Sequence, residues 1–213
     1  MILEKDTLYL KQIEVGLMQN FNYLIGCADT KDCAVVDPAF EVDRIIKIAE
    51  KDGMRITKAL LTHTHFDHMD GIEELTKQIA LEKIFVHKNE AQALRKFKEK
   101  VIEIEDNAVI TIGKVSIKAL HTPGHLPGCV CFLGNNFVIT GDTLFVGAIG
   151  RCDFPESDHK AMYHSLQKLK ELPDDTVVYP GHDYGSAMTS TIGQEKVNNP
   201  YMRVTSEESF SKM

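Results

Sequence analysis

The stretch Thr62-His63-Thr64-His65-Phe66-Asp67-His68 constrains this chain more than any other segment. Three histidines and an aspartate occur within six residues, directly after an apolar run. Imidazole and carboxylate groups are ligands for zinc and other first-row metals. In extended backbone alternate side chains point the same way, so His63 and His65 are placed to hold one ion. If the chain then turns, Asp67 and His68 reach a second ion nearby, and the stretch therefore predicts a metal site.

Length and composition are those of one ordinary domain. The 213 residues are enough to bury a sizeable core. Hydrophobic residues make up 43% and charged residues 26% of the chain, as in typical globular domains. We therefore expect a single domain over residues 1–213, with a polar tail over 205–213 that is disordered.

Several classes of partner are disfavoured by the same sequence. No segment approaches the ~18 consecutive apolar residues of a membrane span, and the N-terminus lacks the pattern of a signal peptide. A cytoplasmic protein without a membrane partner is expected. The formal net charge of −7 disfavours a nucleic-acid partner. The sequence leaves the oligomeric state open.

The five cysteines predict no disulfide framework. Their number is odd, and no Cys-x-x-Cys pair occurs. Cys129 and Cys131 are interpreted as small apolar residues on one face of a strand. Cys152 follows Arg151, and its role is left open.

Hydrophobic periodicity predicts alternating strands and helices in the first half and mostly strands in the second. Strands are expected at 8–14, 22–27, 33–37, 58–61, 83–87, 109–112, 115–121, 129–133, 137–140 and 176–179, and helices at 41–51, 70–80, 89–98, 157–172 and 191–197. The second helix is expected to begin with a capping box over 70–73. The simplest architecture is two facing sheets with helices outside and ligand-bearing loops at the strand ends.

Four further segments place polar residues after apolar runs and beside glycine. They are Thr122-Pro123-Gly124-His125, Ile139-Thr140-Gly141-Asp142-Thr143, Gly150-Arg151-Cys152-Asp153-Phe154 and Tyr179-Pro180-Gly181-His182-Asp183-Tyr184. Glycine relieves crowding where backbone bends sharply or approaches a ligand. Each histidine or aspartate alone has an ordinary structural interpretation, but the set together indicates one site.

These motifs (His-x-His-x-Asp-His, Thr-Pro-Gly-His, Gly-Asp-Thr and Pro-Gly-His) resemble those of the metallo-β-lactamase superfamily, and within it small bacterial glyoxalase II-like hydrolases (hydroxyacylglutathione hydrolases). The resemblance runs from about Asn20 to Met202 and implies an α/β fold, the αββα sandwich of two facing mixed sheets. It also implies two divalent metal ions. By motif position, His63, His65 and His125 hold one ion, Asp67, His68 and His182 hold the other, and Asp142 bridges both together with a hydroxide.

The same resemblance implies a hydrolase. A bound metal lowers the pKa of water from 15.7 towards about 7, which supplies hydroxide at neutral pH. That hydroxide would attack a small acyl thioester of glutathione or another low-molecular-weight thiol. Asp67 and Asp142 would act as the catalytic carboxylates, and Arg151 would bind an anionic part of the substrate. Zinc is the expected metal, with iron and manganese as alternatives.

The match to glyoxalase II is weakest in its substrate contacts. Longer enzymes of that type hold glutathione with a C-terminal helical region, whereas only about 30 residues follow His182 here. They also carry a tyrosine at the position of Asp153. The resemblance therefore leaves the thiol carrier and the acyl group open.

Two alternatives follow from the same motifs. A persulfide dioxygenase would use a single ferrous ion at His63, His125 and Asp142. Thr143 and Gly181 argue against it, because such dioxygenases commonly carry alanine at both positions. A non-catalytic metal-binding protein is the third interpretation, and the complete ligand set argues against it.

Overall fold

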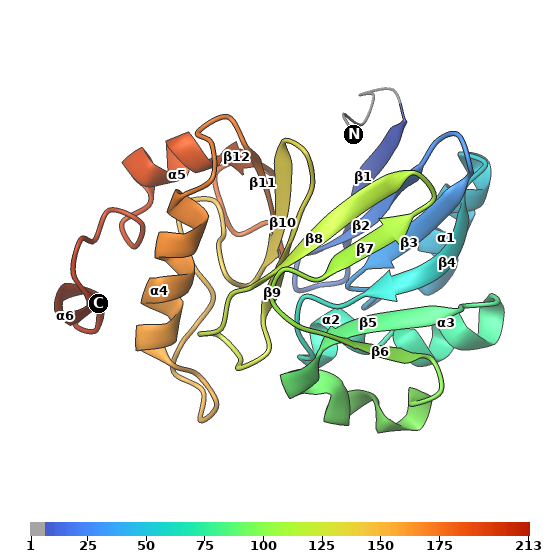
Figure 1. The fold of residues 1–213 in the computed structure, drawn as a ribbon, viewed down its shortest axis with the longest axis horizontal. Coiled ribbons are helices and arrows are strands. Elements are labelled where there is room, and N and C mark those ends of the chain that lie inside the picture. Colours follow the sequence, from blue (N-terminus) through green and yellow to red (C-terminus); the bar gives the residue numbers. More distant parts are fainter. Residues whose placement is uncertain (1–6) are drawn as a thin grey trace.

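A computed structural model, which describes residues 7–213, contains two facing six-stranded sheets with helices on their outer sides (Figure 1). The first sheet has the order β1 (Leu8–Val15), β2 (Asn20–Cys27), β3 (Asp32–Val36), β4 (Arg55–Leu60), β5 (Lys83–His87) and β6 (Val101–Ile104). The second has the order β12 (Ser190–Thr191), β11 (Val177–Pro180), β10 (Phe137–Gly141), β9 (Val130–Leu133), β8 (Val115–His121) and β7 (Val109–Ile112). This arrangement confirms the expected αββα sandwich.

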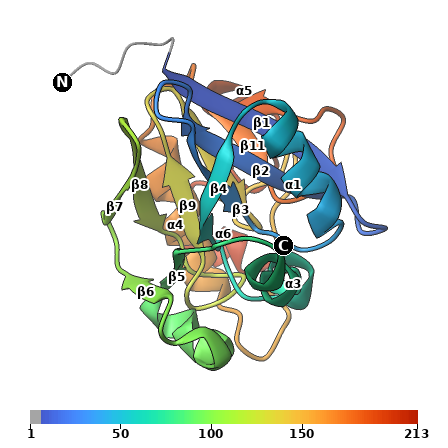
Figure 2. The same cartoon turned by 90° about the vertical axis from the view of Figure 1, so that its right-hand side faces the viewer.

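The helices divide between the two sheets. Four helices lie between strands of the first sheet along the chain: α1 (Val42–Lys51), α2 (Phe66–Met69), α3 (Ile72–Gln78) and the 3₁₀ helix η1 (Lys88–Phe97). Figure 2 looks onto the outer side of this sheet, where α1 and α3 lie. The second sheet is covered by α4 (His159–Lys170), α5 (Ile192–Asn198) and α6 (Glu207–Phe210).

Strand direction changes within each sheet and brings loops to a common edge. In the first sheet β1, β2 and β3 are antiparallel, whereas β3, β4, β5 and β6 run parallel. In the second sheet β7 to β10 are antiparallel, but β10 and β11 run parallel. Parallel neighbours end at the same edge of a sheet, so β3 and β4, and likewise β10 and β11, deliver their following loops side by side.

Three apolar clusters hold the layers together. Between the sheets, Phe21 and Tyr23 of β2 belong to the same buried cluster as Phe132 and Ile139 of the second sheet. The other two clusters lie between each sheet and its own helices. A fully buried side chain of this kind contributes about 1.5–3 kcal/mol relative to exposure.

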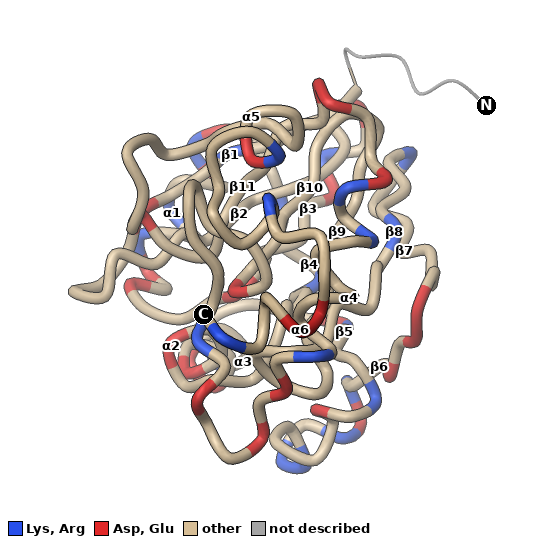
Figure 3. The backbone as a smooth tube through the Cα atoms, turned by 90° about the vertical axis from the view of Figure 1, so that its left-hand side faces the viewer, with Lys and Arg blue, Asp and Glu red and all other residues tan. Residues whose placement is uncertain are grey.

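Surface charges contribute less to stability. Acidic and basic residues are interspersed along the backbone (Figure 3). Typical pairs are exposed, such as Lys77 with Glu73 at 2.8 Å and Lys196 with Asp174 at 2.6 Å. Each such pair is worth about 0–1 kcal/mol. Within residues 7–213 no helix combines the length and the apolar character that a membrane crossing requires. The cytoplasmic location stays a prediction.

Local patterns explain where the long helices begin and end. In α1 the residues Val42, Ile45, Ile46 and Ala49 are buried, which is the spacing of one helix face. Gly53 follows with a φ of 69°, a conformation that favours glycine after a helix. In α4 the carboxylate of Asp158 accepts hydrogen bonds from the first-turn amides at 2.8 and 3.0 Å.

Two local predictions were wrong. The capping box over 70–73 is absent. Asp70, with φ and ψ of −61° and −24°, is the C-cap of α2, and the N-cap of α3 is Gly71, which has no side chain to accept a hydrogen bond. A capping box is found instead at the start of α5, between Thr191 and Gln194. The segment 89–98 is a 3₁₀ helix rather than an α-helix, and buried Leu94 interrupts it with a φ of −99° and a ψ of 19°.

The tail over 205–213 contains a short helix, whereas the sequence favours disorder there. Ser206 accepts a hydrogen bond at its hydroxyl from the amide of Ser209, at 3.3 Å, at the start of α6. Phe210 is 1% exposed and packs beside Tyr163 and Tyr201. Burial of one aromatic ring offsets part of the entropy lost by ordering these residues.

Candidate metal centre and substrate cavity

The seven side chains predicted as metal ligands converge between the edges of the two sheets. His63 and His65 follow β4, Asp67 and His68 lie in α2, and His125, Asp142 and His182 follow β8, β10 and β11. Three groups each bring their ligand atoms within 4.8 Å of one another: His63, His65 and His125; His63, His68 and Asp142; and Asp67, His68 and His182. The first and third are the two sets expected from the motifs, and the second joins them through Asp142.

The carboxylate of Asp142 lies between the two sets. Its Oδ1 is 3.3 Å from Nε2 of His68 and 3.5 Å from Nε2 of His182. Its Oδ2 is 3.6 Å from Nε2 of His125. Burial opposes ionisation, but the neighbouring histidines, His68 above all, hold the pKa of Asp142 well below its usual range. One ionised carboxylate therefore faces both groups.

Glycines around Asp142 allow this close approach. A Cβ atom on Gly181 would lie 2.4 Å from Oδ1 of Asp142, which is closer than real contacts permit. Gly141 adopts a φ of 48°, a conformation that side chains rarely take. The glycines in these motifs thus have a direct steric role at the carboxylate.

Three ligand histidines are oriented from behind by oxygen atoms. The Nδ1 atoms of His68, His125 and His182 lie 3.0, 2.7 and 2.9 Å from the Asp37 carboxylate, the Arg151 carbonyl and the Met18 carbonyl. A carbonyl or carboxylate oxygen accepts only, so each Nδ1 carries the proton. The Nε2 lone pair of each ring then faces the centre, as a metal ligand requires.

Asp37 and Asn20 support the centre, and the sequence interpretation missed both. The carboxylate of Asp37 accepts hydrogen bonds from the Thr62 amide at 2.7 Å and the Thr62 hydroxyl at 2.6 Å, besides contacting His68. The Asn20 amide donates to Oδ2 of Asp67 at 3.0 Å. Asp37 directly follows the apolar strand β3, which is the same signal that identified Asp142.

Glu90 connects the loops on which two of the ligands lie. Its carboxylate accepts a hydrogen bond from the hydroxyl of Thr64, which sits between His63 and His65. It also accepts one from the amide of Gly128 at 3.0 Å, in the loop after His125. Glu90 is buried, so these bonds are sheltered from water.

Unpaired polar atoms at the centre fit a bound cation. Among the described residues, Nε2 of His63 and Oδ1 of Asp142 are buried without a hydrogen-bond partner, which is costly in a protein interior. Nδ1 of His65 lies 2.8 Å from Nε2 of His125, although two ring nitrogens share at most one proton there. Cations would satisfy all of these lone pairs. Five imidazoles and two carboxylates suit zinc, iron or manganese.

The electrostatics of the centre also favour positive charge. Burial lowers the pKa of His63 well below its usual value, so that ring stays neutral and available as a ligand. Burial pulls the pKa of His68 in the same direction, but Asp142 and Asp37 outweigh it and raise that pKa well above the usual value. The buried carboxylates thus create a demand for a cation at this position.

A cavity of about 520 Å³ opens onto the centre. Besides ligands, its lining includes Met18, Phe66, Phe145, Ala148, Ile149, Arg151, Phe154 and Tyr184. Tyr184 stacks on the His182 ring with 4.5 Å between ring centroids. Arg151, predicted to bind an anionic group, does line the cavity, but its guanidinium is paired with Asp153. Burial raises the pKa of Cys152 to about 11, so its thiol is protonated at neutral pH.

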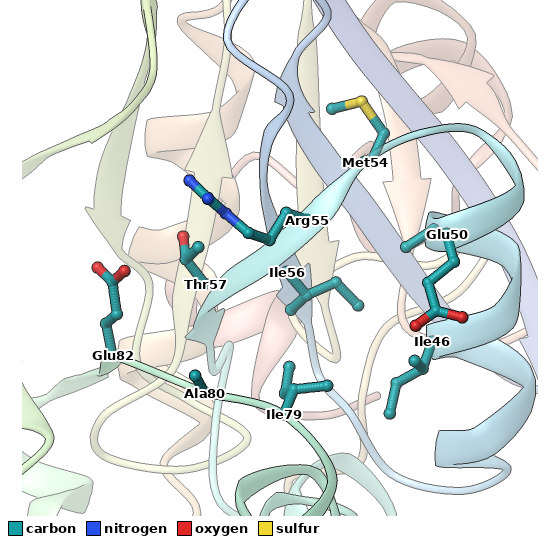
Figure 4. Close-up of a pocket in the computed structure, with 10 residues that line it drawn as sticks. Ile46, Glu50, Met54, Arg55, Ile56, Thr57, Ile79, Ala80 and Glu82 are labelled. Carbon is teal, nitrogen blue, oxygen red and sulfur yellow. The ribbon is translucent and has the colours of Figure 1, made fainter.

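A second cavity, of about 530 Å³, lies away from the centre between α1, β4 and the segment before β5 (Figure 4). Ile46, Ile56 and Ile79 give it an apolar lining with Glu50 and Glu82 beside them. None of its lining residues belongs to the groups that could hold a metal among the described residues. Within residues 7–213, the groups of side chains that could hold a metal all belong to the centre described above.

Comparison with known proteins agrees with this geometry. Residues 15–182 match the Metallo-beta-lactamase superfamily, and the chain belongs to that superfamily. It is 32% identical to the human mitochondrial persulfide dioxygenase ETHE1 over 93% of this chain and 78% of that protein. It is 37% identical to a probable hydroxyacylglutathione hydrolase of Schizosaccharomyces pombe over 83% of this chain and 70% of that one. The crystal structure of ETHE1 from Myxococcus xanthus superimposes with a TM-score of 0.87 at 30% identity, covering 95% of this chain and 88% of that one.

Proposed function

We propose that this protein is a metal-dependent hydrolase that cleaves a small acyl thioester of glutathione or another low-molecular-weight thiol. One divalent ion would be held by His63, His65 and His125. A second would be held by Asp67, His68 and His182, and Asp142 would contribute to both sites. Zinc is the expected metal, with iron and manganese as alternatives. Such ions, when bound, polarise a carbonyl group and lower the pKa of water.

The position of Asp142 carries this proposal. Its two oxygens face different histidine groups, with Oδ1 3.5 Å from His182 and Oδ2 3.6 Å from His125. Asp67, in the group not required by a single-ion site, is 6% exposed. A buried carboxylate is costly without a positive partner, so a second cation explains why Asp67 lies there.

The other steps of hydrolysis would depend on side chains of the protein. Asn20 fixes the carboxylate of Asp67 at the cavity wall, where it would accept a hydrogen bond from an attacking water and orient it. Asp37 keeps the proton of His68 on Nδ1. The leaving group is a thiolate, whose acid has a pKa of about 8.5, so little help from a protein acid is needed. The apolar walls would limit access of further water.

A persulfide dioxygenase is the second candidate. It is favoured by the similarity to ETHE1 proteins in both sequence and structure. In that function His63, His125 and Asp142 would hold one iron, with positions left open for oxygen and substrate. The hydroxyacylglutathione hydrolase relatives support the thioesterase instead.

One preparation separates the two candidates. Metal content per chain is measured by mass spectrometry, and turnover of S-lactoylglutathione and of glutathione persulfide is measured with an oxygen electrode. The proposal expects two metals and thioester cleavage without oxygen uptake. One iron with persulfide-dependent oxygen uptake would overturn it. Two metals with neither activity would keep the metal site and leave the substrate open.

A further inference from the structure

We infer that the thioester taken by this cavity carries no charged group on either side of the thioester bond, and that Asp153 enforces this selectivity by neutralising Arg151. The inference rests on the proposed thioester hydrolysis and adds the class of substrate. It is carried by the pairing of Arg151 with Asp153 and by the apolar character of the lining outside the metal ligands, within the described residues.

Arg151 is the one Lys or Arg side chain that lines the cavity in the described part of the chain. Its Nε lies 2.8 Å from Oδ1 of Asp153, and its Nη2 lies 2.7 Å from Oδ2. This is the bidentate geometry of a guanidinium–carboxylate pair. The guanidinium carbon also lies 4.8 Å from the centre of the Phe154 ring, which is a second contact of the same side chain.

An anionic substrate that approaches Arg151 would compete with Asp153 for the guanidinium. The two side chains of this pair are 69% and 62% exposed, so the pair itself is weak and Arg151 is free to turn away. The carboxylate of Asp153 would nevertheless stay beside the anion and repel it. Binding of a carboxylate, such as those of glutathione, would therefore gain little from Arg151.

The lining outside Arg151 and the metal ligands suits uncharged groups. Phe145, Ile149 and Phe154 come from the segment after β10 and provide an apolar surface. Met18, Phe66 and Tyr184 come from three other segments, and they are 38%, 58% and 51% exposed. Partly exposed apolar side chains grouped around a cavity mark a surface that binds apolar groups. Either half of a thioester would lie against such a surface.

Two matched pairs of thioesters test the inference. The first compares the S-lactoyl thioesters of N-acetylcysteine methyl ester and N-acetylcysteine, which are similar in size but differ in the charge of the thiol half. The second compares the pentanoyl and succinyl thioesters of N-acetylcysteamine, which are similar in size but differ in the charge of the acyl half. The ratio of kcat/KM within each pair is measured for the holoenzyme and for Asp153→Asn. We expect the wild type to prefer the uncharged member of both pairs.

Asp153→Asn should shift each ratio towards the anionic member by about 1.5-fold to fivefold, which is the effect of one exposed charge pair. Asp174→Asn removes an exposed carboxylate that pairs with Lys196 outside the cavity, and it should leave both ratios unchanged. Equal or faster turnover of the anionic members by the wild type would overturn the inference and leave the hydrolase intact. Unchanged ratios in both Asp153→Asn and Asp153→Ala would overturn the role of Asp153. A protein with two metals that cleaves no thioester would overturn the proposed function and this inference with it.

Discussion

The metal ligands lie at the floor of the cavity, where buried hydrogen bonds hold Asp67, His68, His125 and His182 from behind. The side chains at its rim (Met18, Phe66, Arg151 and Tyr184) are exposed by contrast. Behind the floor lie Asp37 and Asn20, which are 2% and 1% exposed. At the rim, Phe66 is 58% exposed. A rigid floor and an adaptable rim separate two tasks: substitutions in the floor should change metal binding, and substitutions at the rim should change substrate choice.

The largest effect is expected for Asp142→Ala, because this carboxylate faces both ligand groups. Metal affinity should fall by more than about 100-fold, since even residues that only support ligands contribute about 10–100-fold. The measurement is metal content per chain after dialysis, with Asp174→Ala as a control for loss of a surface carboxylate. Unchanged metal content in Asp142→Ala would remove this residue from the floor.

A smaller effect is expected for Gly181→Ala. The added Cβ would lie 2.4 Å from Oδ1 of Asp142, the oxygen that faces His68 and His182. Displacing this oxygen should weaken the second ion by about tenfold or more and leave the first in place.

Titration of the metal-free protein with zinc distinguishes the two binding steps for Gly181→Ala. Gly193→Ala is the matched control, because Gly193 lies in α5 and a Cβ there approaches Asp174 at 3.0 Å rather than a ligand. If Gly181→Ala binds both ions as tightly as the wild type, the steric account of this glycine is wrong.

The floor could be predicted from the sequence more fully than its supports or its rim. His63, His125 and Asp142 stand in short motifs after apolar strands, and chemistry restricts which residues hold metals. Their convergence follows from strand order, since the ends of neighbouring parallel strands meet. The fold class was therefore accessible as well, and the superfamily match confirms it.

The supports and the rim depend on contacts between distant segments. Asn20 reaches Asp67 across 47 positions of the sequence, and the Met18 carbonyl meets His182 across 164. No local pattern encodes such pairs. The pairing of Arg151 with Asp153 was not predicted from the sequence either. Asp153 was interpreted as a lost tyrosine contact rather than as a partner of the guanidinium.

A pH-dependent effect should appear just outside the floor, at His87. Its ring stacks on that of His121, which lies four residues before His125. The ring centroids are 4.0 Å apart, and the angle between the ring planes is 8°. Burial, followed by the charge of His121, lowers the pKa of His87 to about 4. An unfolded histidine has a pKa of about 6.5. Between these values the unfolded chain binds more protons, so the free energy of unfolding should fall as the pH drops from about 6.5 to 4.

His87→Asn should flatten this dependence. Asparagine keeps an acceptor at the start of η1, where Nδ1 of His87 accepts from the Asn89 amide at 3.3 Å. Thermal unfolding of both metal-free proteins at pH 7.5 and pH 5 gives the comparison, and the wild type should lose more stability. Parallel losses in the two proteins would show that His87 titrates normally.

The smallest effect is expected at the rim, for Phe66→Ala. The ring lines the cavity but is 58% exposed, so an uncharged substrate would bury only part of it. Loss of about 1 kcal/mol of apolar contact corresponds to a rise in KM of about fivefold for S-pentanoyl-N-acetylcysteamine. Metal content and kcat should stay within about twofold, because uniform binding affects KM alone. Val109→Ala, which removes an exposed apolar side chain from β7, should change neither constant. Loss of metal in Phe66→Ala would show that the rim and the floor are one unit, since Phe66 lies between the ligands His65 and Asp67 in the chain.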